Sequence, residues 1–283
     1  MDTNKLLVAM QCRNVEYGFS DTHLASIDVT RDGDIATVAF NNPGKLNALT
    51  IAMWRELARV MRELSADDAL RCIVLRGAGD AAFAAGADLE EFVTERATLA
   101  QARTYHHEYV NGVLRAVGEC RHPTVAMIQG PCIGGGLEIA CTCDLRIAGE
   151  SGRFGVPINR LGFAIAYDEL AGLLSLAGRA VAAEILLEGR VWNAREAYAK
   201  GLLTRVVPDV QVEGEAYATA RRIADGAPLV ARWHKHFIRR LTVSAPPLTA
   251  AETDANFDYL KTADYRAGLE AFINKKKPKF EGR

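Results

Sequence analysis

Apolar and polar residues alternate between residues 24 and 40. After Thr50 the apolar residues instead recur every three to four positions. In residues 24 to 40 two alternating runs flank Asp32-Gly33, a two-residue turn signal, which predicts a β-hairpin. Thr50 is a suitable N-cap for the helix that follows. The apolar stripe of that helix has a period of 3.6 and consists of Trp54, Leu57, Met61 and Leu64.

The middle of the chain repeats the order strand, glycine-rich turn, helix, strand. Buried strands are predicted at residues 72 to 75 and 124 to 129, each followed by small residues, and a helical pattern runs from 99 to 117. Further segments are a helix at 137 to 143, a strand at 145 to 148 and an extended piece at 154 to 158. This order predicts an α/β core.

From about residue 167 the pattern becomes mainly helical. Asn193 and Glu196 are spaced like a capping box, and Pro208 and Pro228 separate helices. We therefore expect a helical C-terminal region with a boundary near residue 200. The predicted division is an N-terminal extension at 1–20, a core at 21–200 and a helical region at 201–283.

Composition and charge exclude several classes of partner. The chain has 283 residues, 49% of them hydrophobic and 24% charged, which fits a globular protein with one substantial core. Its 34 Lys and Arg against 35 Asp and Glu leave a formal net charge of -1. Nucleic acid and anionic membranes are therefore not expected as partners. An anionic ligand must be held by local features.

The six cysteines lie mostly in apolar runs, and none forms a Cys-x-x-Cys pair. Neither a metal site nor a disulfide framework is predicted. The first residues lack a long apolar stretch with a cleavage site, and no run of about 18 apolar residues follows. We expect a cytoplasmic protein that does not span a membrane.

Two glycine-bounded segments, residues 84 to 88 and 134 to 138, carry the most specific chemistry. Each can direct a backbone N–H into one cleft, and the second opens a helix, which favours an anion. Such donors stabilise the oxygen of a thioester that gains negative charge. Taken alone, each segment is more typical of a tight turn without a ligand.

Together, and in this order, these segments resemble the crotonase superfamily, also called the enoyl-CoA hydratase/isomerase family. The resemblance covers NNPGKLNAL at 41–49, AFAAGADLEEF at 82–92, the run from Pro123 through GPCIGGGLEIACTCDLRIAGE to FGVP at 154–157, and DYRAGLEAFINKKKPKFEGR at the end. It implies a spiral of strand-strand-helix turns, an acyl-CoA substrate, no metal or redox cofactor, and assembly as a homotrimer or a dimer of trimers.

The resemblance also assigns roles in catalysis. Ala87 and Gly135 would supply the amides of an oxyanion hole, and Glu138 would transfer a proton. A carboxylate such as Glu138 is also a common stabiliser of a helix N-terminus, which is the alternative explanation. Its place one turn from the proposed amide donor favours proton transfer.

Ile158 is the main departure from the family pattern. Hydratases of the family carry a second glutamate directly after a Phe-Gly-x-Pro motif, and Ile158 stands there in FGVPI. Isoleucine neither orients nor deprotonates a water molecule. The usual hydration route with two glutamates is therefore not expected.

Three residues are candidates for the missing acid. Asp168 and Glu169 follow a loop at the start of a predicted helix, where ordinary N-terminal charges are the alternative. His106 lies on the apolar stripe of the helix at 99 to 117, where a partly buried histidine with its own partner is the alternative. Asp168 is the residue that we predict to be catalytic.

Coenzyme A contacts follow from the resemblance as well. The expected binding residues surround the two loops and the basic C-terminal segment; they are Lys45, Leu46, Ala48, Ala85, Asp88, Leu89 and Lys275. Lys275 would face a phosphate, although lysine runs at a terminus are often only solvated. Glu90 is unusual, because many relatives have a basic or neutral residue there.

The sequence thus predicts an acyl-CoA enzyme that stabilises a thioester enolate and uses one glutamate for proton transfer. One base suits double-bond isomerisation, and hydration with a water held by Asp168 remains open. The alternatives are a thioester hydrolase or decarboxylase, and a protein that binds acyl-CoA or another protein without turnover.

Overall fold

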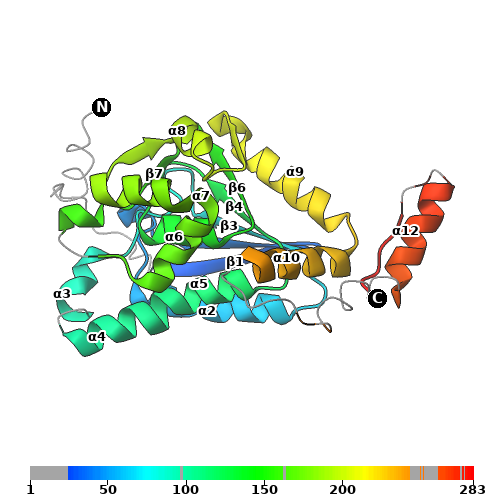
Figure 1. Cartoon of the computed structure of the whole chain (residues 1–283), viewed down its shortest axis with the longest axis horizontal. Coiled ribbons are helices and arrows are strands. Elements are labelled where there is room, and N and C mark those ends of the chain that lie inside the picture. The colour runs from blue at the N-terminus through cyan, green and yellow to red at the C-terminus, as the bar shows by residue number, and fades with distance from the viewer. Residues whose placement is uncertain are drawn as a thin grey trace, which may run out of the picture.

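A computed structural model describes residues 25–95, 98–161, 164–242, 249, 251, 261–274, 276 and 278–283. The predicted extension at 1–20 and Lys275 lie outside the described residues. A six-stranded sheet runs through the molecule, with helices packed on both of its faces (Figure 1).

The six-stranded sheet has the order β1-β2-β3-β4-β6-β9. Its strands are β1 (Ser26–Asp32), β2 (Ile35–Asn41), β3 (Cys72–Gly77), β4 (Thr124–Ile128), β6 (Leu145–Gly149) and β9 (Arg205–Val207). β1 and β2 are antiparallel, and every other neighbouring pair is parallel. A smaller sheet has the order β5-β7-β8, with strands β5 (Pro131–Ile133), β7 (Arg153–Gly155) and β8 (Val191–Asn193).

The N-terminal hairpin forms as predicted, but its turn lies one residue later. Asp32 pairs with Ile35, so the two loop residues are Gly33 and Asp34 rather than Asp32 and Gly33. Gly33 has φ of 60°, the conformation that a two-residue hairpin loop requires at its first position and that glycine adopts without strain.

The helices lie between the strands and in the C-terminal third. The α-helices are α2 (Ile51–Ala66), α3 (Phe92–Glu95), α4 (Leu99–Thr104), α5 (Asn111–Glu119), α6 (Gly135–Thr142), α7 (Tyr167–Glu188), α8 (Ala194–Ala199), α9 (Val212–Ala224), α10 (Pro228–Thr242) and α12 (Ala263–Ile273). Short 3-10 turns are η1 (Pro43–Lys45), η2 (Leu89–Glu91), η4 (Pro157–Leu161) and η5 (Asp209–Gln211), and η3 (Tyr105–Val110) is a π-helix.

Alternate residues of the central strands pack into two separate hydrophobic cores, one on each face of the main sheet. Phe40, Leu75 and Ile128 belong to the larger core, which also takes in the buried faces of α2, α5 and α6. Val74 and Met127 point to the opposite face of the sheet and pack with α9. Because successive side chains of a strand point to opposite faces, these continuously apolar strands serve both layers.

α2 follows its predicted pattern. The Thr50 side chain accepts a hydrogen bond from the Met53 N–H at 3.2 Å, as an N-cap does. The predicted stripe from Trp54 to Leu64 is buried against the core. The helix is thus fixed at its start by the cap and along its length by apolar burial.

The predicted helix at 99 to 117 is not continuous. α4 passes into the π-helix η3, in which the Asn111 N–H donates to the His106 carbonyl, and then into α5. A π-turn inserts one extra residue and rotates the side chains before it relative to those after it, and such turns are frequent at functional sites.

Ile158 also differs from expectation, because it lies on the 3-10 turn η4 rather than in an extended piece.

α7 is long and apolar enough, by length and composition alone, to cross a membrane. Uninterrupted apolar runs had not predicted such a segment. The helix is broken at Gly178, whose φ is 73°, and Leu173 and Ile185 on its two halves are buried in the larger core. α7 therefore packs as a kinked helix on the core.

Beyond residue 200 the described elements are mainly helices, and the strand among them, β9, pairs with β6 at the edge of the main sheet. α9 covers one face of the sheet, and Figure 1 shows α12 at one end of the molecule, apart from the sheet. Arg71 donates to the Phe280 carbonyl at 2.8 Å and attaches the terminal segment to the core.

Candidate functional site

The two glycine-bounded segments meet in the fold. Ala84 forms a parallel bridge with Cys132, and the Ile133 N–H donates to the Ala84 carbonyl at 3.0 Å. Gly86 has φ of 105°, and a Cβ on it would lie 3.1 Å from the Ile133 oxygen and 3.8 Å from the Gly135 nitrogen. Glycine is thus required at position 86 for both conformation and space. The loop before Ala87 therefore lies against the start of α6.

The hydrogen bonds around Ala87 indicate the direction of its N–H. Leu49 forms a parallel bridge with Ala87: the Leu49 N–H donates to the Gly86 carbonyl at 2.8 Å, and the Asp88 N–H donates to the Leu49 carbonyl at 2.9 Å. In this register the N–H of Ala87 itself points away from Leu49.

Gly135 begins α6, so its N–H has no acceptor within the helix. Among the hydrogen bonds of the described residues, none has the N–H of Ala87 or Gly135 as its donor. Two backbone donors on adjoining turns are thus available to an anionic oxygen.

Asn47 joins the loop at 42–47 to residues 78–82, just before the first glycine-bounded segment, a role that sequence reasoning missed. Its side-chain amide is buried and donates to the carbonyls of Ala78 and Ala82 at 3.1 and 2.8 Å, while its oxygen accepts from the Asn42 N–H at 3.1 Å. Asn47 has φ of 57°, which asparagine tolerates better than most residues. A loop asparagine after the Pro43-Gly44 turn was the available signal.

Glu138 and Trp54 converge on Gly135. The point at which a Cβ on Gly135 would lie is 2.8 Å from Trp54 Cζ2 and 3.9 Å from Glu138 Oε2. Trp54 is fully buried, and its indole N–H has no hydrogen-bond partner among the described residues. Glu138 is half-buried in the first turn of α6, where the helix dipole stabilises its negative charge. The carboxylate therefore lies beside the proposed amide donor.

No thiol competes with Glu138 as the reactive group of α6. Cys141 lies one turn further along the helix, and burial raises the pKa of its thiol to about 12. A thiol with this pKa stays protonated near neutral pH and is a poor nucleophile.

The three candidates for the second acid differ in exposure: Asp168 is exposed, whereas Glu169 and His106 are largely buried. The Asp168 side chain is 54% exposed, accepts from Asn111 Nδ2 at 2.9 Å and lies 3.9 Å from His107 Nδ1. Glu169 is only 5% exposed, and its Oε1 lies 2.5 Å from His106 Nδ1. Of these neighbours in sequence, Glu169 is the one directed into the protein. The catalytic role predicted for Asp168 stays a prediction.

The residues expected to contact coenzyme A surround the loop at 45–49 and the segment at 85–89. The Ala85 N–H donates to the Leu46 carbonyl at 3.0 Å, which joins the two loops. Ala48 is buried and Leu89 is exposed. The structure thus brings the backbone of the two predicted binding loops together.

Lys45 is the cation of this region. Its Nζ lies 2.8 Å from Asp88 Oδ2 and 2.7 Å from Glu90 Oε2. Burial lowers the pKa of Lys45, but the hydrogen bonds and charges of Asp88 and Glu90 outweigh burial and hold the pKa above its usual value. Glu90, the unusual residue, therefore has a partner, and the phosphate contact predicted for Lys45 would compete with two carboxylates.

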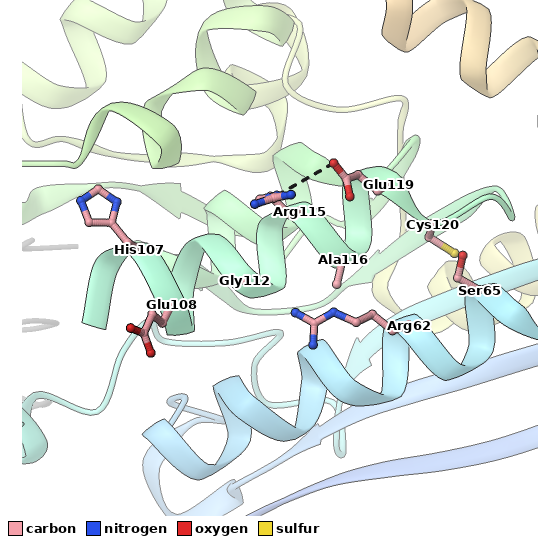
Figure 2. A pocket seen from close by; sticks show the side chains of 9 residues that line it. All are labelled: Arg62, Ser65, His107, Glu108, Gly112, Arg115, Ala116, Glu119 and Cys120. Carbon is pink, nitrogen blue, oxygen red and sulfur yellow. Dashed lines mark ion pairs between the residues drawn. The ribbon is translucent and has the colours of Figure 1, made fainter. Parts of the chain in front are cut away.

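A separate groove of about 460 Å³ lies between α2 and α5. Figure 2 shows its lining, in which Arg62, His107, Arg115 and Glu119 mix positive and negative charge. None of the predicted catalytic residues lines it. His107 lines this groove, whereas its neighbour His106 contacts Glu169 on α7.

The chain is similar to known proteins over most of its length. A family model described as enoyl-CoA hydratase/isomerase matches residues 30–283. The chain belongs to the enoyl-CoA hydratase/isomerase family. A probable enoyl-CoA hydratase, echA8, of Mycobacterium tuberculosis is 34% identical over 259 residues, which cover 91% of this chain and 98% of that protein. A short-chain-enoyl-CoA hydratase of Clostridium acetobutylicum is 31% identical, over 90% of this chain and 97% of that protein.

Solved structures confirm the fold of this enoyl-CoA hydratase/isomerase family member. The crystal structure of an enoyl-CoA hydratase/carnithine racemase from Magnetospirillum magneticum matches with a TM-score of 0.89 and 50% identity, covering 91% of this chain and 96% of that chain. A family protein from Hyphomonas neptunium matches with a TM-score of 0.86 and 31% identity, covering 91% and 98% of the two chains. The predicted crotonase superfamily and its α/β spiral are therefore confirmed.

Proposed function

We propose that the protein catalyses proton transfer on an acyl-CoA thioester of the enoyl-CoA type, with Ala87 and Gly135 holding the enolate oxygen and Glu138 moving the proton at the α-carbon. The observation that carries this proposal is the convergence at Gly135. An available N–H at a helix N-terminus, the adjoining Ala87 turn and the Glu138 carboxylate meet there. Family membership supports the acyl-CoA substrate.

The proposed step begins when the thioester oxygen accepts hydrogen bonds from the N–H groups of Ala87 and Gly135. The Glu138 carboxylate then removes the α-proton, and the electron pair of the broken C–H bond moves through the α-carbon to the thioester oxygen. Backbone donors fixed in advance stabilise this charge without reorganisation, an effect worth about 3–4 kcal/mol for one donor. The Glu138 carboxyl proton then exchanges with solvent, and reprotonation of the α-carbon by Glu138 completes an α-proton exchange that needs no bound cofactor.

The test is deuterium exchange at the α-carbon of a saturated acyl-CoA in heavy water, followed by NMR. Wild type is expected to exchange the α-protons, and Glu138→Gln is expected to lower the exchange rate by at least about 10²-fold, because the amide cannot accept the proton. Glu188→Gln, a substitution of an exposed glutamate on α7, serves as the control. Undiminished exchange in Glu138→Gln, or none in wild type, contradicts the proposal.

We further propose that the protein assembles as a homotrimer or a dimer of trimers. Large apolar side chains are exposed on two helices: Leu187 of α7 is 77% exposed, and Ile238 and Leu241 of α10 are 64% and 66% exposed. Apolar surface of this kind favours contact between copies of a chain. Light scattering coupled to size-exclusion chromatography measures the mass, and a monomer at micromolar concentration contradicts this assembly.

A further inference from the structure

His106 and Glu169 form a buried pair on two different elements. His106 Nδ1 lies 2.5 Å from Glu169 Oε1, and the side chains are 16% and 5% exposed. The second carboxylate oxygen, Glu169 Oε2, accepts from the Ala166 N–H at 3.2 Å. The Tyr105 ring packs edge-to-face on the imidazole. Both side chains are therefore fixed in position, as a proton-transfer pair requires.

The local backbone is arranged around this pair. His106 lies on the π-helix η3, and its own carbonyl accepts the i+5 hydrogen bond from Asn111. The extra residue of the π-turn changes the direction of His106 relative to α5, and the neighbouring His107 is 65% exposed. The turn thus directs one of two adjacent histidines to the buried carboxylate on α7.

The packing of α6 brings the pair near the proposed catalytic site. α6 packs between α5 and α7 (Figure 1). A Cβ on Gly172 of α7 would lie 3.5 Å from Cys141 Cβ and 3.5 Å from Thr142 Oγ1 of α6. Glu138 lies about one turn from this contact on α6, and Glu169 lies one turn from it on α7. Both carboxylates therefore flank one helix contact.

We propose that His106, positioned by Glu169, is the second proton-transfer group of the acyl-CoA site and activates the water that adds at the β-carbon. This inference rests on the proposed function, because it takes Glu138 and the two amides as the α-carbon half of the site. Because Ile158 stands where hydratases of the family carry their second glutamate, the half of the site at the β-carbon lacks a carboxylate. In this proposal the buried pair supplies the missing base from other elements, η3 and α7.

The chemistry follows from the hydrogen bond at Nδ1. An ionised carboxylate is only an acceptor, so Glu169 selects the tautomer with the proton on Nδ1 and leaves the lone pair on Nε2. Nε2 takes a proton from water while the water oxygen bonds to the β-carbon and the C=C electron pair moves toward the thioester oxygen. Glu138, which enters this direction of the reaction protonated and leaves it as the carboxylate that acts in α-exchange, then gives its proton to the α-carbon, forming a 3-hydroxyacyl product. The imidazolium releases its proton to solvent, and Glu138 takes one up.

The test separates the two halves of the site with two assays on the same variants. Hydration of a 2-enoyl-CoA reports both halves, whereas α-proton exchange of a saturated acyl-CoA reports only Glu138 and the amides. In His106→Asn we expect kcat for hydration to fall by about 10²–10⁴-fold at nearly unchanged KM, with α-exchange within about threefold of wild type. Glu169→Gln, which keeps an acceptor for the Ala166 N–H, is expected to lower kcat less but in the same pattern.

His107→Asn is the matched control, since it changes the adjacent histidine of the same turn, and both activities are expected to persist. A parallel fall of hydration and exchange in His106→Asn would show that the pair only holds the fold together, and would overturn the proposal. Equal hydration by His106→Asn and wild type overturns it too, as does a loss confined to Asp168→Asn. Wild type that exchanges α-protons without hydrating also refutes this inference alone, whereas absence of exchange refutes the proposed function itself.

Discussion

A hydrogen is the largest substituent that the site accommodates at Gly135. A Cβ at this position would lie 2.8 and 2.9 Å from two carbons of the buried Trp54 ring. Cβ atoms in proteins essentially never approach another heavy atom this closely. The glycine therefore serves a close approach between the start of α6 and α2, in addition to any approach by a ligand.

Gly135→Ala is expected to displace the amide at the start of α6 and to lower α-proton exchange by about 10²-fold or more, because the donor leaves its position. The NMR exchange assay described above measures this. The double variant Gly135→Ala/Trp54→Leu removes the ring atoms that clash and is expected to recover part of the rate. If the double variant is no faster than Gly135→Ala, the clash with Trp54 is not the cause.

The resemblance in sequence predicts the roles of Ala87, Gly135 and Glu138, which stay predictions, and the fold brings their segments together as those roles require. The sequence did not locate the contact of Trp54 with Gly135, since the apolar stripe of α2 shows only that Trp54 is buried. The choice between Asp168 and Glu169 likewise needed the structure. Both residues have the same charge at the start of α7, and only the packing of α7 decides which one reaches His106.

At the scale of elements, the breaks in helices were the features least visible in the sequence. The stripe from residue 99 to 117 predicts one helix, and its period does not reveal the π-turn at η3. α7 is broken at Gly178, which is exposed, has φ of 73° and has no atom within 4 Å of a Cβ position. The requirement for glycine there is thus conformational and not steric.

Gly178→Ala is expected to reduce the free energy of unfolding by about 1 kcal/mol, because a left-handed conformation is costly for alanine. Gly214→Ala is the matched comparison: Gly214 is exposed in α9, has no positive φ and also has open space at its Cβ position. Gly214→Ala is expected to raise the free energy of unfolding by about 0.5–1 kcal/mol, since alanine favours a helix. Urea unfolding measures the free energy of unfolding of both variants. A change of the same sign in the two variants would contradict the conformational role of Gly178.

At the scale of the whole molecule, α10 is held to the core by long cationic side chains. Lys235 Nζ donates to the His122 carbonyl at 2.9 Å and lies 2.7 Å from Asp144 Oδ2, while Arg239 donates to the Gly118 carbonyl at 3.1 Å. His122 itself is fully buried beside them. Burial, with the positive charges of Arg232, Arg121 and Lys235, lowers the pKa of His122 to about 4.

Acid is therefore expected to weaken the whole fold through His122. Its folded pKa of about 4 lies below the ordinary value of 6.5, so the unfolded chain binds the extra proton first. The stability that a neutral His122 provides is present above pH 6.5 and is lost as the pH falls toward 4, by up to about 3 kcal/mol. Urea unfolding of wild type and His122→Asn between pH 4 and 7 measures this, and the variant should show the smaller slope with pH. Identical slopes would contradict the low pKa.

The donors of the proposed oxyanion hole are main-chain atoms, and this affects how the protein can evolve. Any substitution at residue 87 or 135 other than proline changes a side chain but leaves an N–H in place, so such a mutation removes a donor only by moving the backbone. Residues 138, 158 and 106 have no such protection, and each can be exchanged while the carbonyl remains held. A lineage built on this scaffold is therefore free to replace one acid or base at a time, keeping a bound thioester through every intermediate ancestor.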